Sequence, residues 1–117
     1  MSETPEKPDP ALARLDRQMR KGVLGVAALG ALAHAPLHGY ALAQEVKDVT
    51  GTAIPEGTLY PLLASFEAAG WVKTRWDTSK PGPARKVYSV TPQGVEALSA
   101  LAARFKSLTQ AVQKGLP

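Results

Sequence analysis

The spacing of apolar residues changes twice along this chain, and that change constrains the fold more than any other feature. Up to Gly70 apolar side chains recur every three or four residues, as in amphipathic helices. From Trp71 to Val90 they alternate with polar ones, as in strands with one wet face. The helical spacing returns after Thr91. Because 117 residues suffice for one domain, we predict a mainly α fold with a small β-hairpin.

The first helix should follow a short tail, residues 1–9, that holds no large apolar side chain apart from Met1. Asp9 is a suitable N-cap, Pro10 suits the first helical position, and Pro36 closes the segment. We interpret the segment as a core helix. Its expected apolar stripe is Leu12, Leu15, Met19, Val23, Val26, Leu29 and Leu32.

Two shorter helices follow, over residues 39–50 and 55–70, separated by the linker 51–54. Gly51 and Gly70 are expected to end them, since glycine tolerates the left-handed conformation. Pro61 requires the third helix to begin close before it, so Gly57 or Thr58 is the predicted cap. The expected buried residues are Leu42, Val46 and Val49 on the second helix and Leu59, Leu62, Leu63 and Phe66 on the third.

The alternating segment predicts a hairpin with strands near 71–77 and 85–90 and a loop over 78–84. Val72, Thr74 and Trp76 should share one face, opposite Lys73, Arg75 and Asp77. Thr91 and Pro92 then begin a last helix. Its apolar residues step by three and four, as in a heptad seam: Leu98, Leu101, Phe105, Leu108 and Val112.

Composition excludes several kinds of site. The chain has no cysteine, which rules out disulfides and thiolate chemistry. His34 and His38 are four apart, but Pro36 interrupts them and nothing completes a metal site. Acid–base pairs, nucleophile motifs and phosphate loops are absent. We therefore predict no enzyme, no cofactor and no metal.

An exported or membrane protein is the alternative for residues 17–43. Arg17, Arg20 and Lys21 precede an uncharged run that ends in small residues, which imitates a secretory signal. The basic cluster lies far from Met1, however, and glycines and Pro36 interrupt the run where a span needs about 20 apolar residues. A cytoplasmic protein is the expectation.

The charge distribution points to a polyanion. The chain carries a net charge of +4, and residues 71–91 hold five basic residues against Asp77 alone. Helix, turn, helix and basic hairpin in this order are typical of a winged helix-turn-helix, in which a basic loop lines a DNA groove. The predicted wing contacts are Lys80, Arg85 and Lys86. A solvated loop with incidental charge is the alternative.

The third helix supplies the candidate recognition surface. With its apolar face inward, it presents Thr58, Tyr60, Pro61, Ala64 and Ser65 outward. Hydroxyl groups near a helix N-terminus can contact phosphates, although no Arg, Asn or Gln offers a bidentate base contact. Any sequence preference should then rely on small apolar contacts and DNA shape. Alternatively, Tyr60 packs against the second helix.

Four stretches in order make the chain resemble the PadR family of bacterial transcriptional regulators: LHGYALAQEV, GTLYPLLASFEAAGWV, PARKVYSVT and PQGVEAL. The resemblance covers residues 21–98 and implies a winged helix-turn-helix repressor that dimerises through its C-terminal helix and often senses small aromatic or drug-like molecules. Thr58, Tyr60 and Pro61 match recognition-helix positions, and Arg85 and Lys86 match the wing. The short final helix is similar to that of the compact subgroup.

Two features depart from the family's pattern. Ala64 and Ser65 stand where members often carry basic residues, so affinity should depend on the wing. No tryptophan follows Trp76, so a ligand pocket built on a tryptophan of the last helix is not expected.

We thus predict a dimeric, cytoplasmic regulator, with residues 10–91 as the double-stranded-DNA-binding domain and 92–117 as the dimerisation helix. The expected operator is near-palindromic. The last helix could instead fold back on the first. Two other functions stay open: a protein-interaction module that uses Tyr60, Trp71 or Trp76, and an apolar ligand groove near Phe105.

Overall fold

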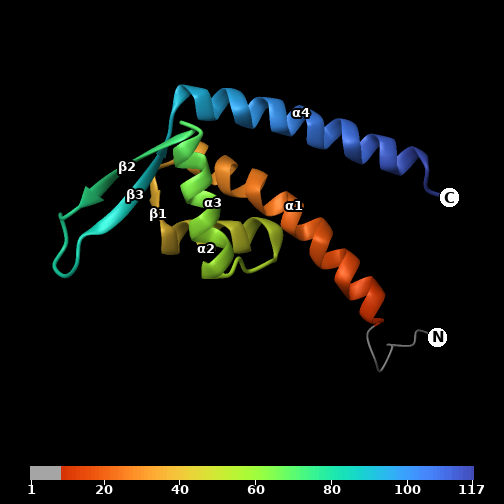
Figure 1. Cartoon of the computed structure of the whole chain (residues 1–117), viewed down its shortest axis with the longest axis horizontal. Helices are drawn as coiled ribbons and strands as arrows, with labels where there is room; N and C mark the ends of the chain where they lie inside the picture. The colour runs from red at the N-terminus through yellow and green to blue at the C-terminus, as the bar shows by residue number, and fades with distance from the viewer. Residues whose placement is uncertain (1–8) are drawn as a thin grey trace.

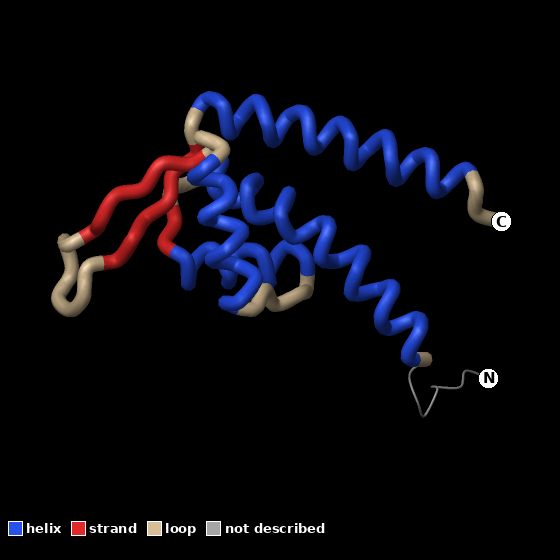
Figure 2. Tube along the Cα trace, viewed as in Figure 1, coloured by secondary structure: helices blue, strands red, loops and turns tan. Residues whose placement is uncertain are grey.

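The computed structural model describes residues 9–117 as a small helical body with a projecting hairpin (Figures 1 and 2). The element order is α1 (Pro10–His34), β1 (Leu37–His38), α2 (Gly39–Thr50), α3 (Glu56–Ala68), β2 (Val72–Asp77), β3 (Arg85–Val90) and α4 (Pro92–Lys114). The predicted mainly α fold with a small sheet is confirmed. Apart from Asp9, the predicted tail lies outside the described residues.

Local capping chemistry sets the ends of most helices. The Asp9 carboxylate accepts from the Ala11 N–H at 2.9 Å, and the Thr91 hydroxyl oxygen accepts from the Gly94 N–H at 3.1 Å. Gly51 ends α2 with φ 72°, a conformation that glycine adopts without a Cβ penalty.

The predicted cap of α3 is wrong. The helix begins at Glu56 after Pro55, whose carbonyl accepts from the N–H groups of Thr58 and Leu59 at 2.9 and 2.8 Å. Pro61 therefore lies in the second helical turn and leaves the Gly57 carbonyl without its intrahelical donor. Both residues are exposed, so water can supply the missing hydrogen bond.

The sheet has three antiparallel strands in the order β1-β3-β2. The hairpin pairs Val72 with Val90 and Asp77 with Arg85, close to the predicted bounds. The two-residue strand β1 was not predicted; it pairs Leu37 with Tyr88 on the other edge of β3. This pairing joins the hairpin to the start of α2.

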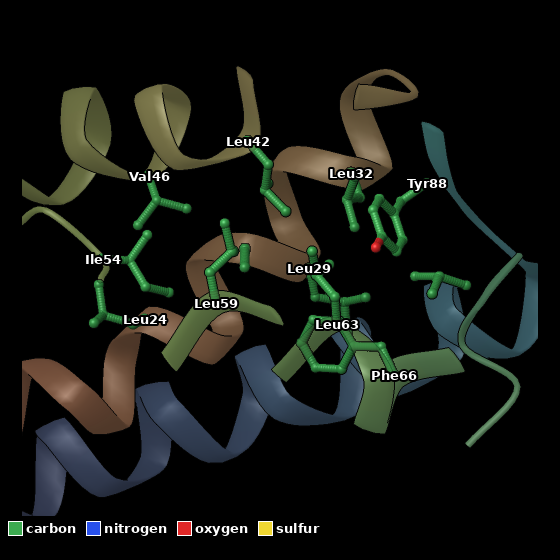
Figure 3. Packing of buried hydrophobic residues seen from close by; sticks show 12 residues of the cluster. Leu24, Leu29, Leu32, Leu42, Val46, Ile54, Leu59, Leu63, Phe66 and Tyr88 are labelled. Atoms are coloured by element: carbon green, nitrogen blue, oxygen red, sulfur yellow. The ribbon is translucent and has the colours of Figure 1, made fainter. Parts of the chain in front are cut away.

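The core lies between α1, α2, α3 and the base of the hairpin (Figure 3). Its fully buried large side chains are Leu29, Leu32, Leu42, Val46, Leu59 and Leu63. Burying each one contributes about 1.5–3 kcal/mol relative to exposure. Tyr88 from β3 closes the core on the hairpin side.

Several predicted core residues are exposed instead. Leu12, Leu15 and Met19 are more than 60% exposed, whereas the buried residues of α1 all lie between Leu24 and Leu32. Val49 at the end of α2 is 74% exposed. The prediction of α1 as a core helix is thus wrong for its N-terminal half, which projects away from the body and diverges from α4 (Figure 1).

The exposure of Trp76 also differs from the prediction. This side chain was expected on a covered face of the hairpin with Val72, yet Val72 is 3% exposed and Trp76 is 65% exposed. Trp76 is the next-to-last residue of β2, and the loop end of the hairpin extends past the helical body (Figure 1).

Among residues 9–117, no helix is long and apolar enough to cross a membrane. Within the same residues, no three His, Asp or Glu side chains come together as a metal site.

Candidate nucleic-acid interface

The exposed side of α3 presents the predicted recognition residues. Pro61 and Ser65 are exposed, Tyr60 is 47% exposed, and Thr58 is half-buried. The Ser65 hydroxyl donates to the Leu62 carbonyl at 2.7 Å, so its oxygen is left to accept from a partner. These four side chains are uncharged, as predicted, and they offer hydroxyl groups rather than bidentate donors.

Tyr60 connects α3 to the start of α2. A Cβ placed on Gly39 would lie 2.7 Å from the Tyr60 hydroxyl oxygen, which shows that the phenol lies directly against this glycine. Tyr60 therefore packs on α2, which was the alternative interpretation, while almost half of its side chain stays exposed. Glycine at position 39 is what allows this close approach.

The two strands and the loop 78–84 form a hairpin that we call the wing. Paired residues in an antiparallel ladder share a face. Thr74 and Lys86 both contact Glu67 of α3, at 3.2 and 3.7 Å, which defines the α3 face of the wing. This face comprises Val72, Thr74, Trp76, Lys86, Tyr88 and Val90, and the opposite face comprises Lys73, Arg75, Asp77, Arg85, Val87 and Ser89.

Arg85 and Lys86 therefore point to opposite faces. Besides its ion pair with Glu67, the Lys86 ammonium lies 5.6 Å from the centroid of the Tyr88 ring. Burial raises the pKa of Tyr88, while the nearby Lys86 charge opposes that shift. Lys86 is thus partly neutralised within the protein, whereas Glu67 carries a negative charge close to the proposed DNA surface.

Arg85 contacts the edge of the helical body. Its Nη1 lies 3.2 Å from Nε2 of His38, whose Nδ1 accepts from the Ala41 N–H at 3.4 Å at the start of α2. The wing and the N-terminus of α2 are thereby joined through one imidazole. On the same face, Lys73 and Arg75 are exposed cations that the sequence analysis did not name as contacts. In the sequence, the alternation of these two cations with Val72 and Thr74 was the signal that places them together on the other face of the strand.

Lys80 lies in the exposed loop at the end of the wing. Next to it, the Asp77 carboxylate accepts from the Ser79 N–H at 2.9 Å and shapes the start of the loop. Hydrogen bonding by Ser79, with smaller contributions from Arg75 and Lys80, lowers the pKa of Asp77. The wing therefore keeps one anion, Asp77 at the end of β2, beside the cations Arg75 and Lys80.

The predicted dimer seam divides into a covered and an uncovered part. Leu98 and Leu101 pack against the core, so the last helix does fold back on its own chain at this end. Phe105, Leu108 and Val112 are 43%, 65% and 55% exposed. They line an open groove of about 920 Å3 between α4 and α1, whose other apolar walls include Met19, Val23, Val26 and Val49.

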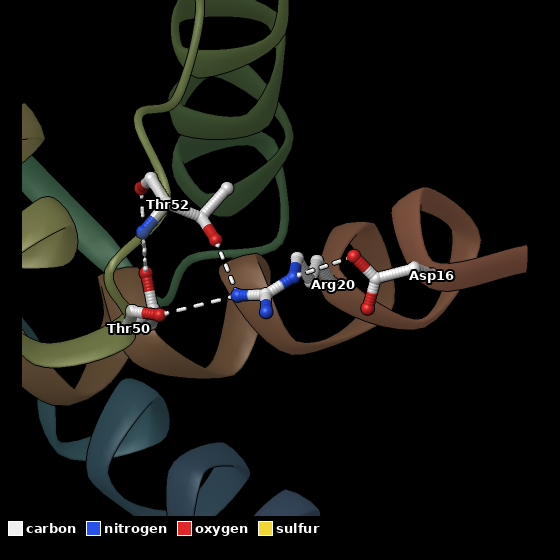
Figure 4. A network of polar contacts seen from close by, with 4 residues as sticks. All are labelled: Asp16, Arg20, Thr50 and Thr52. Carbon is white, nitrogen blue, oxygen red and sulfur yellow. Dashed lines mark hydrogen bonds and ion pairs between the residues drawn. The ribbon is translucent and has the colours of Figure 1, made fainter. Parts of the chain in front are cut away.

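A polar cluster borders this groove (Figure 4). Arg20 of α1 pairs with Asp16 at 3.1 Å, donates to the Thr52 hydroxyl oxygen at 2.8 Å and reaches the Thr50 carbonyl at 3.5 Å. A guanidinium at the C-terminal end of α2 also complements the helix dipole. Arg20 thus holds the turn between α2 and α3 against α1.

The model of the transcriptional regulator PadR-like family matches residues 28–100. This chain belongs to that family. A PadR family regulator from Eggerthella lenta shares 31% identity with it over 89% of this chain and 90% of the other, with a TM-score of 0.82. A PadR-like regulator from Bacillus cereus shares 29% identity over 83% and 94%, with a TM-score of 0.72.

A curated relative of the PadR-like chain is an uncharacterised 37.1 kDa protein in a Streptomyces fradiae transposon. The identity is 35% over 80 residues, which is 68% of this chain and 22% of that protein. The chain therefore spans about a fifth of the length of this relative.

Family membership confirms the predicted resemblance and supports a DNA-binding transcriptional regulator, not an enzyme. The matched residues contain α2, α3 and the wing but stop before Phe105. The exposed seam residues Phe105, Leu108 and Val112 lie outside the family match, so their role is inferred from this PadR-like chain itself.

Proposed function

We propose that this PadR-like protein is a cytoplasmic homodimeric repressor that binds a near-palindromic operator and is released by a small aromatic or drug-like molecule. The proposed DNA contacts are Thr58, Tyr60, Pro61, Ser65, Lys80, Arg85 and Lys86, to which we add Lys73 and Arg75. The proposed dimer contacts are Leu98, Leu101, Phe105, Leu108 and Val112.

The uncovered apolar groove carries the dimer proposal. Exposed apolar area costs about 25 cal/mol per Å2 relative to burial, and this groove has apolar walls on both α1 and α4. A second copy of the chain presents the same two stripes, and a two-fold pairing would cover both at once. The groove lies between α1 and α4, and both helices extend away from the wing (Figure 1). A dimer formed there leaves both wings free at its outer ends.

A two-fold dimer also explains the proposed operator. Each subunit would bring α3 and one wing to a half-site, and half-sites for such dimers are spaced by about 34–36 Å, one turn of the duplex. The symmetry of the protein then requires a near-palindromic sequence. Repression is proposed from the resemblance to the family, and it would follow where the operator overlaps a promoter.

Any part of the groove that the second copy leaves unfilled is also our proposed effector site, so that the ligand would lie between the two subunits. Phe105 offers an aromatic surface among aliphatic side chains, which suits a flat apolar molecule. Asp16, Arg20, Thr50 and Thr52 line the same groove and hold the turn before α3. A ligand that displaced Arg20 would therefore shift the recognition helix, which couples the two sites.

Selection of bound fragments from genomic DNA tests the proposal. We expect enrichment of near-palindromic sites with half-sites one helical turn apart, and affinity that falls steeply with salt. Absence of enrichment would favour the protein-interaction alternative and would overturn the proposed function. Enrichment of sites without internal symmetry would retain DNA binding but contradict the dimeric operator complex.

A further inference from the structure

Trp76 is a large apolar side chain that neither the core nor the groove uses. It is 65% exposed near the far end of the wing. The other tryptophan, Trp71, is half-buried and packs on Phe66 with ring centroids 5.7 Å apart. An indole group exposed to water gains no free energy from burial in the fold, and it would gain this free energy on contact with a partner.

The surroundings of Trp76 indicate the chemistry of that partner. Lys86 lies directly across the ladder from Trp76, Arg75 precedes it, and Lys80 lies in the adjoining loop. An aromatic ring among cations matches nucleic acid, where bases and sugars offer apolar surface beside phosphates. The wing also lies far from the groove, so the proposed dimer does not cover it (Figure 1).

The face of the wing that carries Trp76 indicates which part of the DNA this side chain would contact. Thr74 and Lys86 of this face touch Glu67, so the face is turned toward α3. When α3 occupies a major groove and the wing an adjacent minor groove, the DNA backbone that separates the two grooves passes between them. In that arrangement Trp76 would face the deoxyribose rings of that backbone.

We propose that Trp76 packs against the sugar–phosphate backbone of duplex DNA and supplies an apolar contact that supports the cationic contacts of the wing. This inference rests on the proposed DNA-binding function and adds to it a contact that no charge argument predicts. This contact should raise the affinity for DNA without changing its salt dependence, because an indole group displaces no counterions from phosphate.

Fluorescence of the full chain tests the contact directly. In a Trp71→Phe variant, Trp76 is the sole tryptophan, and duplex DNA should shift its emission and protect it from acrylamide quenching. The matched control is Trp76→Phe, in which Trp71 should keep the same emission with and without DNA. A bound complex in which Trp76 is quenched as readily as in the free protein would overturn the proposal.

Affinity measurements provide the second test. Trp76→Ala should weaken binding to a selected duplex by on the order of tenfold, the effect of losing one apolar side chain that the complex buries. The slope of log affinity against log salt should stay unchanged, and Trp76→Phe should retain most of the affinity. Unchanged affinity in Trp76→Ala would refute this contact alone, whereas wild-type protein that binds no duplex would refute the proposed function as well.

Discussion

At the scale of single residues, Gly94 at the start of α4 occupies a position where no side chain fits. A Cβ there would collide with the Trp71 carbonyl and approach Val90 Cγ2 to 2.6 Å. We expect Gly94→Ala to destabilise the protein by about 1–3 kcal/mol, the usual cost of overpacking. Gly22→Ala, which meets nothing within 4 Å in α1, should instead stabilise by about 0.5–1 kcal/mol.

Urea unfolding of the two alanine variants measures this difference. Both substitutions add one methyl group to a helical glycine, so helix propensity cancels in the comparison and the collision with Trp71 remains. Equal unfolding midpoints for the two variants would show that α4 can shift away from the wing.

Glu67 lowers the contribution of Lys86 to DNA binding. The carboxylate holds the ammonium at 3.7 Å and places a negative charge on the α3 face of the wing. Glu67→Gln should therefore raise duplex affinity and steepen its salt dependence by about one released ion. Gel-shift titrations at several salt concentrations measure both quantities. In Glu67→Gln combined with Lys86→Ala the steeper slope should disappear, and if it persists, Glu67 acts on another cation.

At the scale of elements, the wing is expected to contribute through its two faces independently. Arg85→Ala should lower the salt slope by about one, and Lys86→Ala should lower it by less, because Glu67 partly neutralises the Lys86 ammonium. Their effects on log affinity should add, since the side chains lie on opposite faces and contact different residues, His38 and Glu67. The double variant in the same titration checks this. A smaller combined loss would mean that both cations reach the same phosphate.

Elements set by local chemistry were predictable from the sequence. Gly51 and Thr91 act through their own backbone and the next turn, so α2 and the start of α4 have their predicted bounds. The strand Leu37–His38 was not predictable, because its two residues are held only by pairing with Tyr88 and Val87, about 50 residues away. Helical spacing likewise placed Val49 on the apolar face of α2 but could not show that nothing covers that end.

The candidate site was likewise predictable where local sequence patterns determine it, and not where it depends on how the elements pack. The excess of positive charge identified the wing, and alternation in a strand requires Arg85 and Lys86 to point apart. Which of the two meets a carboxylate depends on the position of Glu67 in the fold, and the sequence carries no signal for it. The contact of Tyr60 with Gly39 similarly depends on how α2 and α3 cross.

At the scale of the whole molecule, the chain has an extended shape of 56 × 32 × 22 Å, with the wing at one end and the diverging helices α1 and α4 at the other. Such a shape leaves the groove side chains of α1 and α4 in water unless a second copy joins them. Leu108→Asp places a charge in the centre of that groove, where pairing would have to bury it. We expect the wild type to be a dimer and this variant to be a monomer by sedimentation across a concentration series.

The Leu108→Asp variant also tests whether dimerisation affects DNA binding without a change in folding. Leu108 is 65% exposed, so Leu108→Asp should leave the helical circular dichroism unchanged. Ser107→Asp is the matched control, since this neighbouring exposed position on α4 does not line the groove. A monomer contacts one half-site instead of two, so the affinity of Leu108→Asp for a two-half-site duplex should fall far more than that of the control. Monomeric wild-type protein would overturn the proposed dimer, whereas a dimeric Leu108→Asp variant would place the pairing surface elsewhere on the chain.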